Sequence, residues 1–247
     1  MHTADTGSDG TALDSPDPDP VALSHEFLRT VKTGGSTHRV ASRLRDLDRE
    51  ALAGGLDGDD ARLAFWINVY NAAVESLLDA APETFGDRSA LFGADVVTVA
   101  GRDLSPNDVE HALLRGARPV WGLGFVRNPF PSAFSARFGV DDLDPRIHFA
   151  LNCGAAACPP IAAYTRDGID RELDTATRSY LEQETEYDPD AGVVRAPRLL
   201  LWYLGDFGGP SGATRFLREY GALPEDAAPK LRFRDYDWSL ETGNFAE

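Results

Sequence analysis

Residues 61–80 constrain the fold of this chain most strongly, because they form one long and almost uniformly apolar segment. Asp60 is suited to cap the first turn of a helix here, and Pro82 is suited to end it. A helix that is apolar most of the way round belongs inside a hydrophobic core, so we expect this helix to be central. Its most regular apolar stripe consists of Leu63, Ile67, Tyr70, Val74 and Leu77.

Shorter elements are expected on both sides of this helix. Hydrophobic periodicity and capping residues predict helices over residues 21–32, 37–52, 105–115, 169–184, 198–204 and 213–220. Apolar or alternating runs predict strands over residues 95–100, 193–195 and 231–236. Since helices dominate and strands are few, the sequence predicts an α+β fold, a mostly helical single domain with a small antiparallel sheet.

The ends of the chain differ in composition. Residues 1–20 are rich in Asp, Ser, Thr, Gly and Pro, which predicts a disordered acidic tail, and residues 21–247 are expected to form one globular domain. The longest apolar run, residues 199–204, is far shorter than the roughly 20 residues that cross a bilayer. No secretory signal is recognisable at the start of the chain. We therefore expect a soluble, cytoplasmic protein.

The chain is strongly acidic, with 24 Lys and Arg residues against 40 Asp and Glu residues and a net charge of −16. This charge repels phosphate backbones and anionic membranes, so we expect neither nucleic acid nor a membrane as partner. Because the acids are spread along the chain, they favour a solvated surface adapted to high salt, as in halophilic proteins. The alternative is an acidic surface for a basic partner.

Three polar residues interrupt the apolar helix at positions that share one face, namely Asn68, Asn71 and Glu75. A buried amide or carboxylate without a partner costs about 1–3 kcal/mol, so each of these side chains needs one. The row either ties the helix to neighbouring loops or faces a ligand, and the sequence leaves both interpretations open.

His111 follows Glu110 on the expected helix 105–115. Asp108 and Arg115 lie about one turn away on either side, which favours a solvated face of ion pairs. The functional alternative is a general base that titrates near neutral pH and is oriented by a carboxylate.

The segment from residue 146 to residue 160 contains His148, Asn152 and both cysteines of the chain, Cys153 and Cys158. Its start is compatible with a helix or a strand, and we favour a helix. The two thiols are expected to be buried structural residues, a catalytic nucleophile, or zinc ligands together with His148. No other cofactor is expected. A disulfide is disfavoured for a chain in the cytoplasm.

Several of these stretches resemble motifs of the domain of unknown function 547 family. They are FWINVYNA (residues 65–72), NDVEH (107–111) with LR (114–115), RIHFALNCGA (146–155), CPP (158–160) and YDWSL (236–240). The motifs occur in the family's order and span residues 60–240. One departure is the run of three alanines at 155–157, where many relatives have a polar residue just before the second cysteine. The family has no agreed activity, so the resemblance implies the domain and not the reaction.

The resemblance implies that the motif residues include a polar site, and our leading hypothesis is a thiol-dependent hydrolase or acyl-transfer enzyme. In it Cys153 is the nucleophile, His111 its base, and Glu110 or an asparagine the orienting group. Asn68 or Asn152 would donate to the oxyanion. Two alternatives remain. One is a non-catalytic domain that binds a small molecule or peptide and has structural cysteines, and the other is a zinc-binding domain. The expected binding residues are Asn68, Asn71, Glu75, His148 and Asn152.

Overall fold

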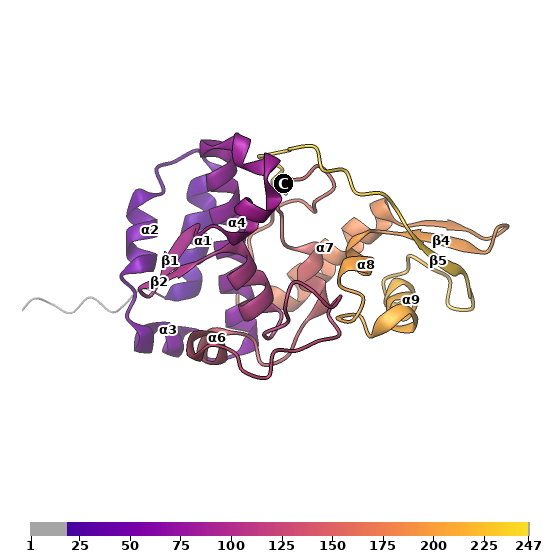
Figure 1. Ribbon diagram of the computed structural model, residues 1–247, viewed down its shortest axis with the longest axis horizontal. Helices are drawn as coiled ribbons and strands as arrows, with labels where there is room; N and C mark the ends of the chain where they lie inside the picture. Colours follow the sequence, from indigo (N-terminus) through magenta and orange to yellow (C-terminus); the bar gives the residue numbers. More distant parts are fainter. Residues whose placement is uncertain (1–18, 247) are drawn as a thin grey trace, which may run out of the picture.

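The computed structural model describes residues 19–246, so residues 1–18 of the predicted tail lie outside the described part of the chain. The predicted mostly helical α+β fold is confirmed (Figure 1). In chain order the helical elements are α1 (Pro20–Lys32), α2 (His38–Arg45), α3 (Arg49–Gly55), α4 (Asp59–Ala80), η1 (Pro82–Gly86), α5 (Arg88–Gly93), η2 (Asp108–Leu114), α6 (Ala133–Phe138), η3 (Pro145–Phe149), α7 (Ile169–Glu184), α8 (Leu199–Trp202) and α9 (Gly209–Glu219).

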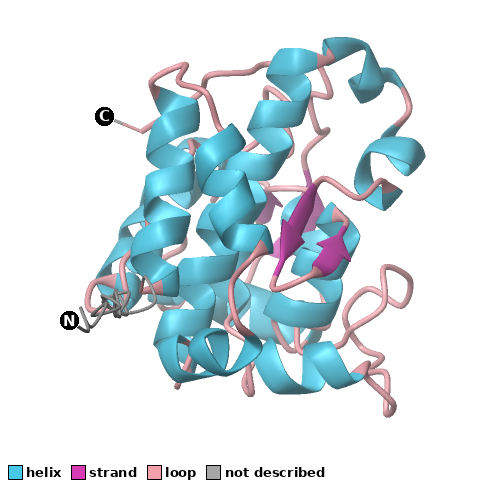
Figure 2. Ribbon diagram, turned by 90° about the vertical axis from the view of Figure 1, so that its left-hand side faces the viewer, coloured by secondary structure: helices cyan, strands magenta, loops and turns pink. Residues whose placement is uncertain are grey.

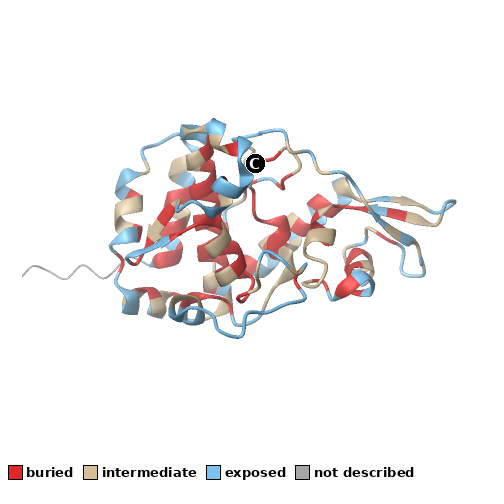
Figure 3. Cartoon of the chain, in the orientation of Figure 1, coloured by how far each residue is buried: buried red, intermediate tan, exposed pale blue. Residues whose placement is uncertain are grey.

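Helix α4 lies at the centre of the larger hydrophobic core, as its composition predicts (Figure 3). It packs along α1, and nearly every residue from Ala61 to Glu75 is buried. Trp66 is fully buried and its indole N–H donates to the carbonyl of Phe138, 2.8 Å away, so its one polar atom has a partner. Burial of each large apolar side chain contributes about 1.5–3 kcal/mol, so the buried residues of α4 add substantially to the stability of the fold.

Two predicted helix boundaries are wrong. Gly58, and not Asp60, occupies the N-cap position of α4. The carboxylate of Asp59, the first residue of the helix, accepts hydrogen bonds from the backbone of residues 141 and 142. The expected helix 37–52 is two helices, because Asp48 caps a new one: its Oδ1 accepts from the N–H groups of residues 50 and 51. The chain therefore turns between α2 and α3.

Two small sheets complete the fold. The first is an antiparallel hairpin of β1 (Val97–Val99) and β2 (Arg102–Leu104), the pair of magenta arrows beside the helices in Figure 2. Ala100 and Gly101 form its turn with positive φ angles of 49° and 69°, so the expected strand 95–100 ends earlier than predicted. In the second sheet, β4 (Val193–Ala196) pairs antiparallel with β3 (Glu186–Asp188) and parallel with β5 (Lys230–Phe233).

A second, smaller hydrophobic cluster lies among α7, α8, α9 and the second sheet. The short 3-10 helix η3 connects the two cores, since Ile147 belongs to the larger one and Phe149 to the smaller one. The expected helix at 146–152 is thus only this single turn. His148 lies between these two anchors, at the boundary of the two clusters.

Candidate functional site

A cavity of about 310 Å³ opens at this boundary and collects side chains from distant parts of the sequence. Its polar wall comes from η2, η3 and the loop that follows η3, and its apolar wall comes from α4, α8 and the C-terminal segment. The lining residues are Tyr70, Phe92, Asn107, Glu110, His111, Val120, Leu123, His148, Leu151, Cys153, Cys158, Leu199, Trp202, Tyr203, Tyr236 and Trp238.

The helix η2 presents two of the polar residues, and its geometry is unusual. Ser105 and Asp108 form a capping box, in which each side chain accepts from the other's backbone N–H, at 3.1 and 3.0 Å. The following residues form a π-helix, with the N–H of Arg115 bonded to the carbonyl of Glu110 five residues earlier. Glu110, His111 and Arg115 are all buried, so the predicted solvated ion-pair face is wrong.

The hydrogen bond from Arg115 fixes the protonation of His111. Arg115 Nη1 lies 2.6 Å from His111 Nδ1, and a guanidinium only donates, so Nδ1 must accept. Burial also lowers the pKa of His111, with further lowering from Arg115, against the opposing effect of Glu110. The ring is therefore neutral with its proton on Nε2. His111 presents an N–H donor there, not the lone pair of a base.

His148 is fixed in a different way, by Asp206, which follows α8. Its Nε2 lies 2.9 Å from Asp206 Oδ2. Burial alone would raise the pKa of Asp206, but His148 and Arg115 outweigh it, so the carboxylate is ionised and His148 donates. Burial lowers the pKa of His148, which leaves a neutral ring with the lone pair on Nδ1. The ring stacks on Tyr203 with 3.7 Å between ring centroids.

Asp206 is the centre of a buried ionic cluster. Its side chain has no exposed surface; Oδ2 lies 2.8 Å from Arg115 Nε, and Oδ1 lies 3.4 Å from Arg118 Nε. Glu110 completes this group. Burial would raise its pKa, but His111, His148, Tyr203 and Arg115 together hold it below its ordinary value. Glu110 Oε1 is buried and has no hydrogen-bond partner among the described residues.

The two cysteines form the second polar group of the cavity. Their sulfur atoms lie 3.0 Å apart, and Cys158 Sγ also accepts from the N–H of Cys153 at 3.1 Å and lies 3.2 Å from Tyr236 Oη. Burial would raise the pKa of Cys158, but these three donors lower it to about 7. The contact with Cys158, followed by burial, raises the pKa of Cys153. The thiolate therefore forms on Cys158, and Cys153 keeps its proton.

The expected pairing of Cys153 with His111 is not formed. Among the described residues, Cys153 Sγ has polar contacts with Cys158 and Tyr236 and with no histidine. His111 Nδ1 is taken by Arg115, and Glu110 Oε1 lies 3.9 Å from it, beyond hydrogen-bond distance. Both residues line the same cavity, but the geometry does not make His111 the base of Cys153.

The asparagines of the expected site lie outside the cavity wall and bind backbone instead. Asn68 accepts from the backbone N–H of Tyr164 and donates to its carbonyl, and Asn71 accepts from the N–H of Asn152 and donates to the carbonyl of Ala150. The amide of Asn152 donates to the carbonyl of Pro159 at 2.8 Å. Glu75 accepts from the N–H of residue 243. The three asparagines hold the loop that carries both cysteines against α4, and Glu75 holds the C-terminal segment there.

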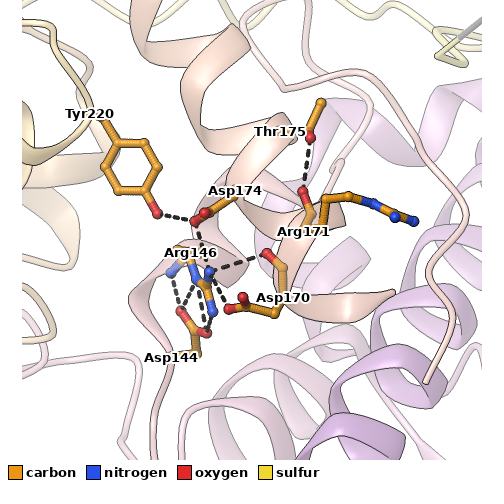
Figure 4. Close-up of polar contacts among 7 residues, drawn as sticks. All are labelled: Asp144, Arg146, Asp170, Arg171, Asp174, Thr175 and Tyr220. Atoms are coloured by element: carbon orange, nitrogen blue, oxygen red, sulfur yellow. Dashed lines mark hydrogen bonds and ion pairs between the residues drawn. The ribbon is translucent and has the colours of Figure 1, made fainter. Parts of the chain in front are cut away.

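A wider cleft of about 900 Å³ lies near Arg146, on η3. The charges around Arg146 are paired with one another (Figure 4). Arg146 contacts the carboxylates of Asp144, Asp170 and Asp174 at 2.6 to 2.8 Å, and Tyr220 donates to Asp174 at 2.6 Å. This network ties η3 to α7 and so fixes the backbone that carries His148.

The zinc alternative requires three ligands close together. Within residues 19–246, no group of three His, Cys, Asp or Glu side chains is placed to hold a metal ion. His148 Nε2, the expected third ligand beside the two thiols, is bonded to Asp206.

Several residues of the site were missed by sequence reasoning, chiefly Tyr203, Asp206 and Tyr236. Tyr236 lies in the YDWSL motif, and that motif was the available signal. Asp206 lies in a glycine-flanked turn, residues 205–209, and a single acid there is inconspicuous among 40 acidic residues. Tyr203 lies three residues before Asp206, in an apolar run that by itself indicates only a helix.

The titrating groups of the site predict how stability depends on pH. In the unfolded chain His111 and His148 titrate at their ordinary value of 6.5, whereas in the folded chain their pKa values are lower. Below 6.5 the unfolded state therefore binds more protons, so the free energy of unfolding falls as pH drops. Glu110 and Asp206, also lowered, continue this loss at more acid pH. Urea unfolding at pH 7.5 and 5.5 measures it, and equal or greater stability at 5.5 contradicts the assignment.

Comparison with known proteins gives one match. The family model described as "Protein of unknown function, DUF547" matches residues 55–181, just over half of the chain. This stretch contains Glu110, His111, His148, Cys153 and Cys158, while Asp206 and Tyr236 lie beyond it. No curated protein and no solved structure matches the chain. No helix within residues 19–246 has both the length and the apolar character needed to span a membrane.

Proposed function

The chain belongs to the DUF547 family of proteins of unknown function, and from that premise we propose that its cavity catalyses thiol-dependent acyl transfer or hydrolysis with Cys158 as the nucleophile. The observation that carries this proposal is the set of three donors around Cys158 Sγ, all within 3.2 Å. A thiolate, not a thiol, attacks an acyl carbon, and donors that stabilise it keep it available at neutral pH.

The neutral ring of His111 suits the second requirement of acyl transfer, which is stabilisation of the oxyanion. Its Nε2–H has no partner among the described residues, and His111 lines the cavity. A donor of this kind, fixed before the substrate binds, lowers the barrier because it needs no reorganisation as charge develops on the carbonyl oxygen. Arg115 acts through His111 as a positioning residue.

His148 suits the final step, the release of the acyl group by water. Asp206 holds its Nε2–H, as a carboxylate orients the histidine of a catalytic triad, and this leaves Nδ1 as a proton acceptor. Nδ1 would take one proton from water as the hydroxyl oxygen attacks the acyl carbon. The bond to Cys158 then breaks and the thiolate is restored.

The pH dependence of alkylation tests whether Cys158 carries the thiolate. With iodoacetamide, the rate at Cys158 is expected to rise with a midpoint of about 7, because the thiolate is the reactive form. Peptide mass mapping locates the adduct. Cys158→Ser is expected to remove the reaction near pH 7. Cys153→Ser, the matched control, keeps it, since its hydroxyl also donates to the Cys158 sulfur.

Two outcomes would count against the proposal. An adduct that forms near pH 7 on Cys153 moves the nucleophile to the residue that the sequence favours. If both thiols are alkylated only at the pH at which an ordinary thiol ionises, the two cysteines are structural. The cavity is then a site for a non-catalytic ligand.

A further inference from the structure

We propose that the acyl donor is a thioester with an apolar acyl group, a substrate class that rests on the proposed function and narrows it. Two features of the cavity carry this inference. One is the position of the protons on its side chains, which limits the leaving group. The other is the wall formed by Val120 and Leu123, which limits the acyl group.

Cleavage of an amide or an alkyl ester needs a proton for the departing nitrogen or oxygen. A cysteine enzyme normally takes that proton from an imidazolium beside the thiolate. Here His111 cannot gain a second proton while Arg115 Nη1 donates to its Nδ1 at 2.6 Å. His148 uses its one N–H on Asp206. Neither ring therefore carries a spare proton for a leaving group.

The other polar groups of the cavity are no better as acids. Cys153 and Tyr236 bear protons, but both donate toward the Cys158 sulfur, and their pKa values are raised, which makes them weaker acids than usual. Glu110 and Asp206 have lowered pKa values and hold no proton at neutral pH. Tyr70 and Tyr203 also line the cavity, and burial raises the pKa of both hydroxyls. The cavity thus offers a nucleophile, a donor for the oxyanion and a base, without a general acid.

A thioester fits this inventory because its leaving group departs as a thiolate. Cys158 S⁻ adds to the carbonyl carbon, the carbon–sulfur bond of the substrate breaks, and the electron pair leaves on the substrate's sulfur. Water then adds to the acyl group, gives one proton to His148 Nδ1, and releases Cys158 S⁻. The second proton of the water stays on the carboxylic acid product, and the proton on His148 neutralises the departed thiolate.

The acyl group is indicated by the loop between η2 and α6. Val120 and Leu123 line the cavity, yet they are 64% and 45% exposed, so they form its mouth. Trp121 and Phe125 beside them are 70% and 61% exposed, so the apolar surface continues outward from the cavity. An acyl chain longer than the cavity would leave along this surface and bury it, which stabilises binding in proportion to the area covered.

A matched pair of substrates tests the leaving group. The octanoyl thioester of N-acetylcysteamine and its oxygen analogue, 2-acetamidoethyl octanoate, differ in one atom. The selectivity is the kcat/KM value for the thioester divided by that for the ester. With the whole protein, this ratio is expected to equal or exceed the ratio of the rates at which a free thiolate in solution attacks the same two substrates. A general acid would assist only the ester and lower the enzyme's ratio by about 10²-fold or more. A ratio below that of the free thiolate overturns the assignment.

The acyl group is tested by chain length. Octanoyl thioester is expected to react with a kcat/KM at least about tenfold above acetyl thioester. Val120→Ser with Leu123→Ser should remove this preference, and alkylation of Cys158 with its midpoint still at about 7 shows that the site is intact. Phe130→Ser, in the same loop but outside the cavity wall, is the control. If the double variant still prefers octanoyl thioester, Val120 and Leu123 do not bind the acyl group, and the inference of an apolar acyl site at the mouth is wrong.

These results separate the two proposals. If neither substrate acylates Cys158, the proposed function fails and the substrate class fails with it. If both substrates acylate Cys158 but the ratio of thioester to ester falls below that of a free thiolate, the proposed function stands and only the thioester assignment is lost.

Discussion

Cys158→Ser is expected to lower the rate of acyl transfer by about 10³-fold or more. The three donors around this position stabilise a thiolate, but a serine hydroxyl stays protonated unless a base takes its proton. No histidine contacts either sulfur among the described residues, so nothing activates the hydroxyl. Initial rates with an activated acyl ester, measured for the wild type and the variant under the same conditions, give the ratio.

Cys153→Ser is the matched control for this prediction. The variant keeps the backbone N–H that bonds Cys158 and replaces one sulfur donor by a hydroxyl donor, so the loss is expected to stay within about tenfold. If instead Cys153→Ser abolishes turnover and Cys158→Ser does not, Cys153 is the nucleophile and the role proposed for Cys158 is wrong.

Asp206→Ala is expected to destabilise the protein by about 3–5 kcal/mol. Among the described residues, Asp206 is the one carboxylate hydrogen-bonded to both Arg115 and His148, and this substitution removes it. Arg115 is 1% exposed, so its charge stays buried without a counterion, and the pairing of Arg118 is lost as well. The free energy of unfolding in urea at pH 7.5 measures the effect. Asp206→Asn, which keeps an acceptor, is expected to fall between Asp206→Ala and the wild type and serves if the alanine variant does not fold.

An exposed pair of the same type provides the comparison. Asp141 contacts Arg62 at 2.7 Å, but its side chain is 80% exposed, so Asp141→Ala is expected to cost less than about 1 kcal/mol. Equal losses for Asp141→Ala and Asp206→Ala would show that burial of the Asp206 cluster contributes nothing to stability.

Local patterns were sufficient to predict the centre of the fold. Helix α4 was expected in the core because apolar residues surround its axis, and that argument needs no knowledge of its neighbours. The capping box at Ser105 is local in the same way, since both of its partners lie within four residues. The mostly helical α+β class follows from such patterns. The helix boundary at Asp48 was missed because the polar–apolar spacing continues through this residue, so periodicity alone does not show that Asp48 caps a new helix.

The site depends on contacts that sequence spacing does not contain. The π-helical geometry of η2, which buries Glu110, His111 and Arg115 together, arises from packing against the rest of the fold and leaves no signature in residue type. Asp206 meets His148 across 58 positions of sequence. The sequence therefore indicated cysteines and histidines that line one cavity, but the positions of their protons follow only from contacts in the structure.

The same limit explains the asparagines. Asn68 and Asn71 look alike whether they face a ligand or a loop, because the same hydrogen-bonding groups serve both. The structure places their partners in the backbone of Ala150, Asn152 and Tyr164, so they support the site by holding its loop.

Locating the acyl group on the protein tests the central claim most directly. The full chain is incubated with octanoyl thioester, quenched in acid, digested and mapped by mass spectrometry. We expect an octanoyl group on Cys158 that disappears on further incubation after excess substrate is removed. An octanoyl group on Cys153, or an unmodified Cys158 in protein that is consuming the substrate, contradicts it.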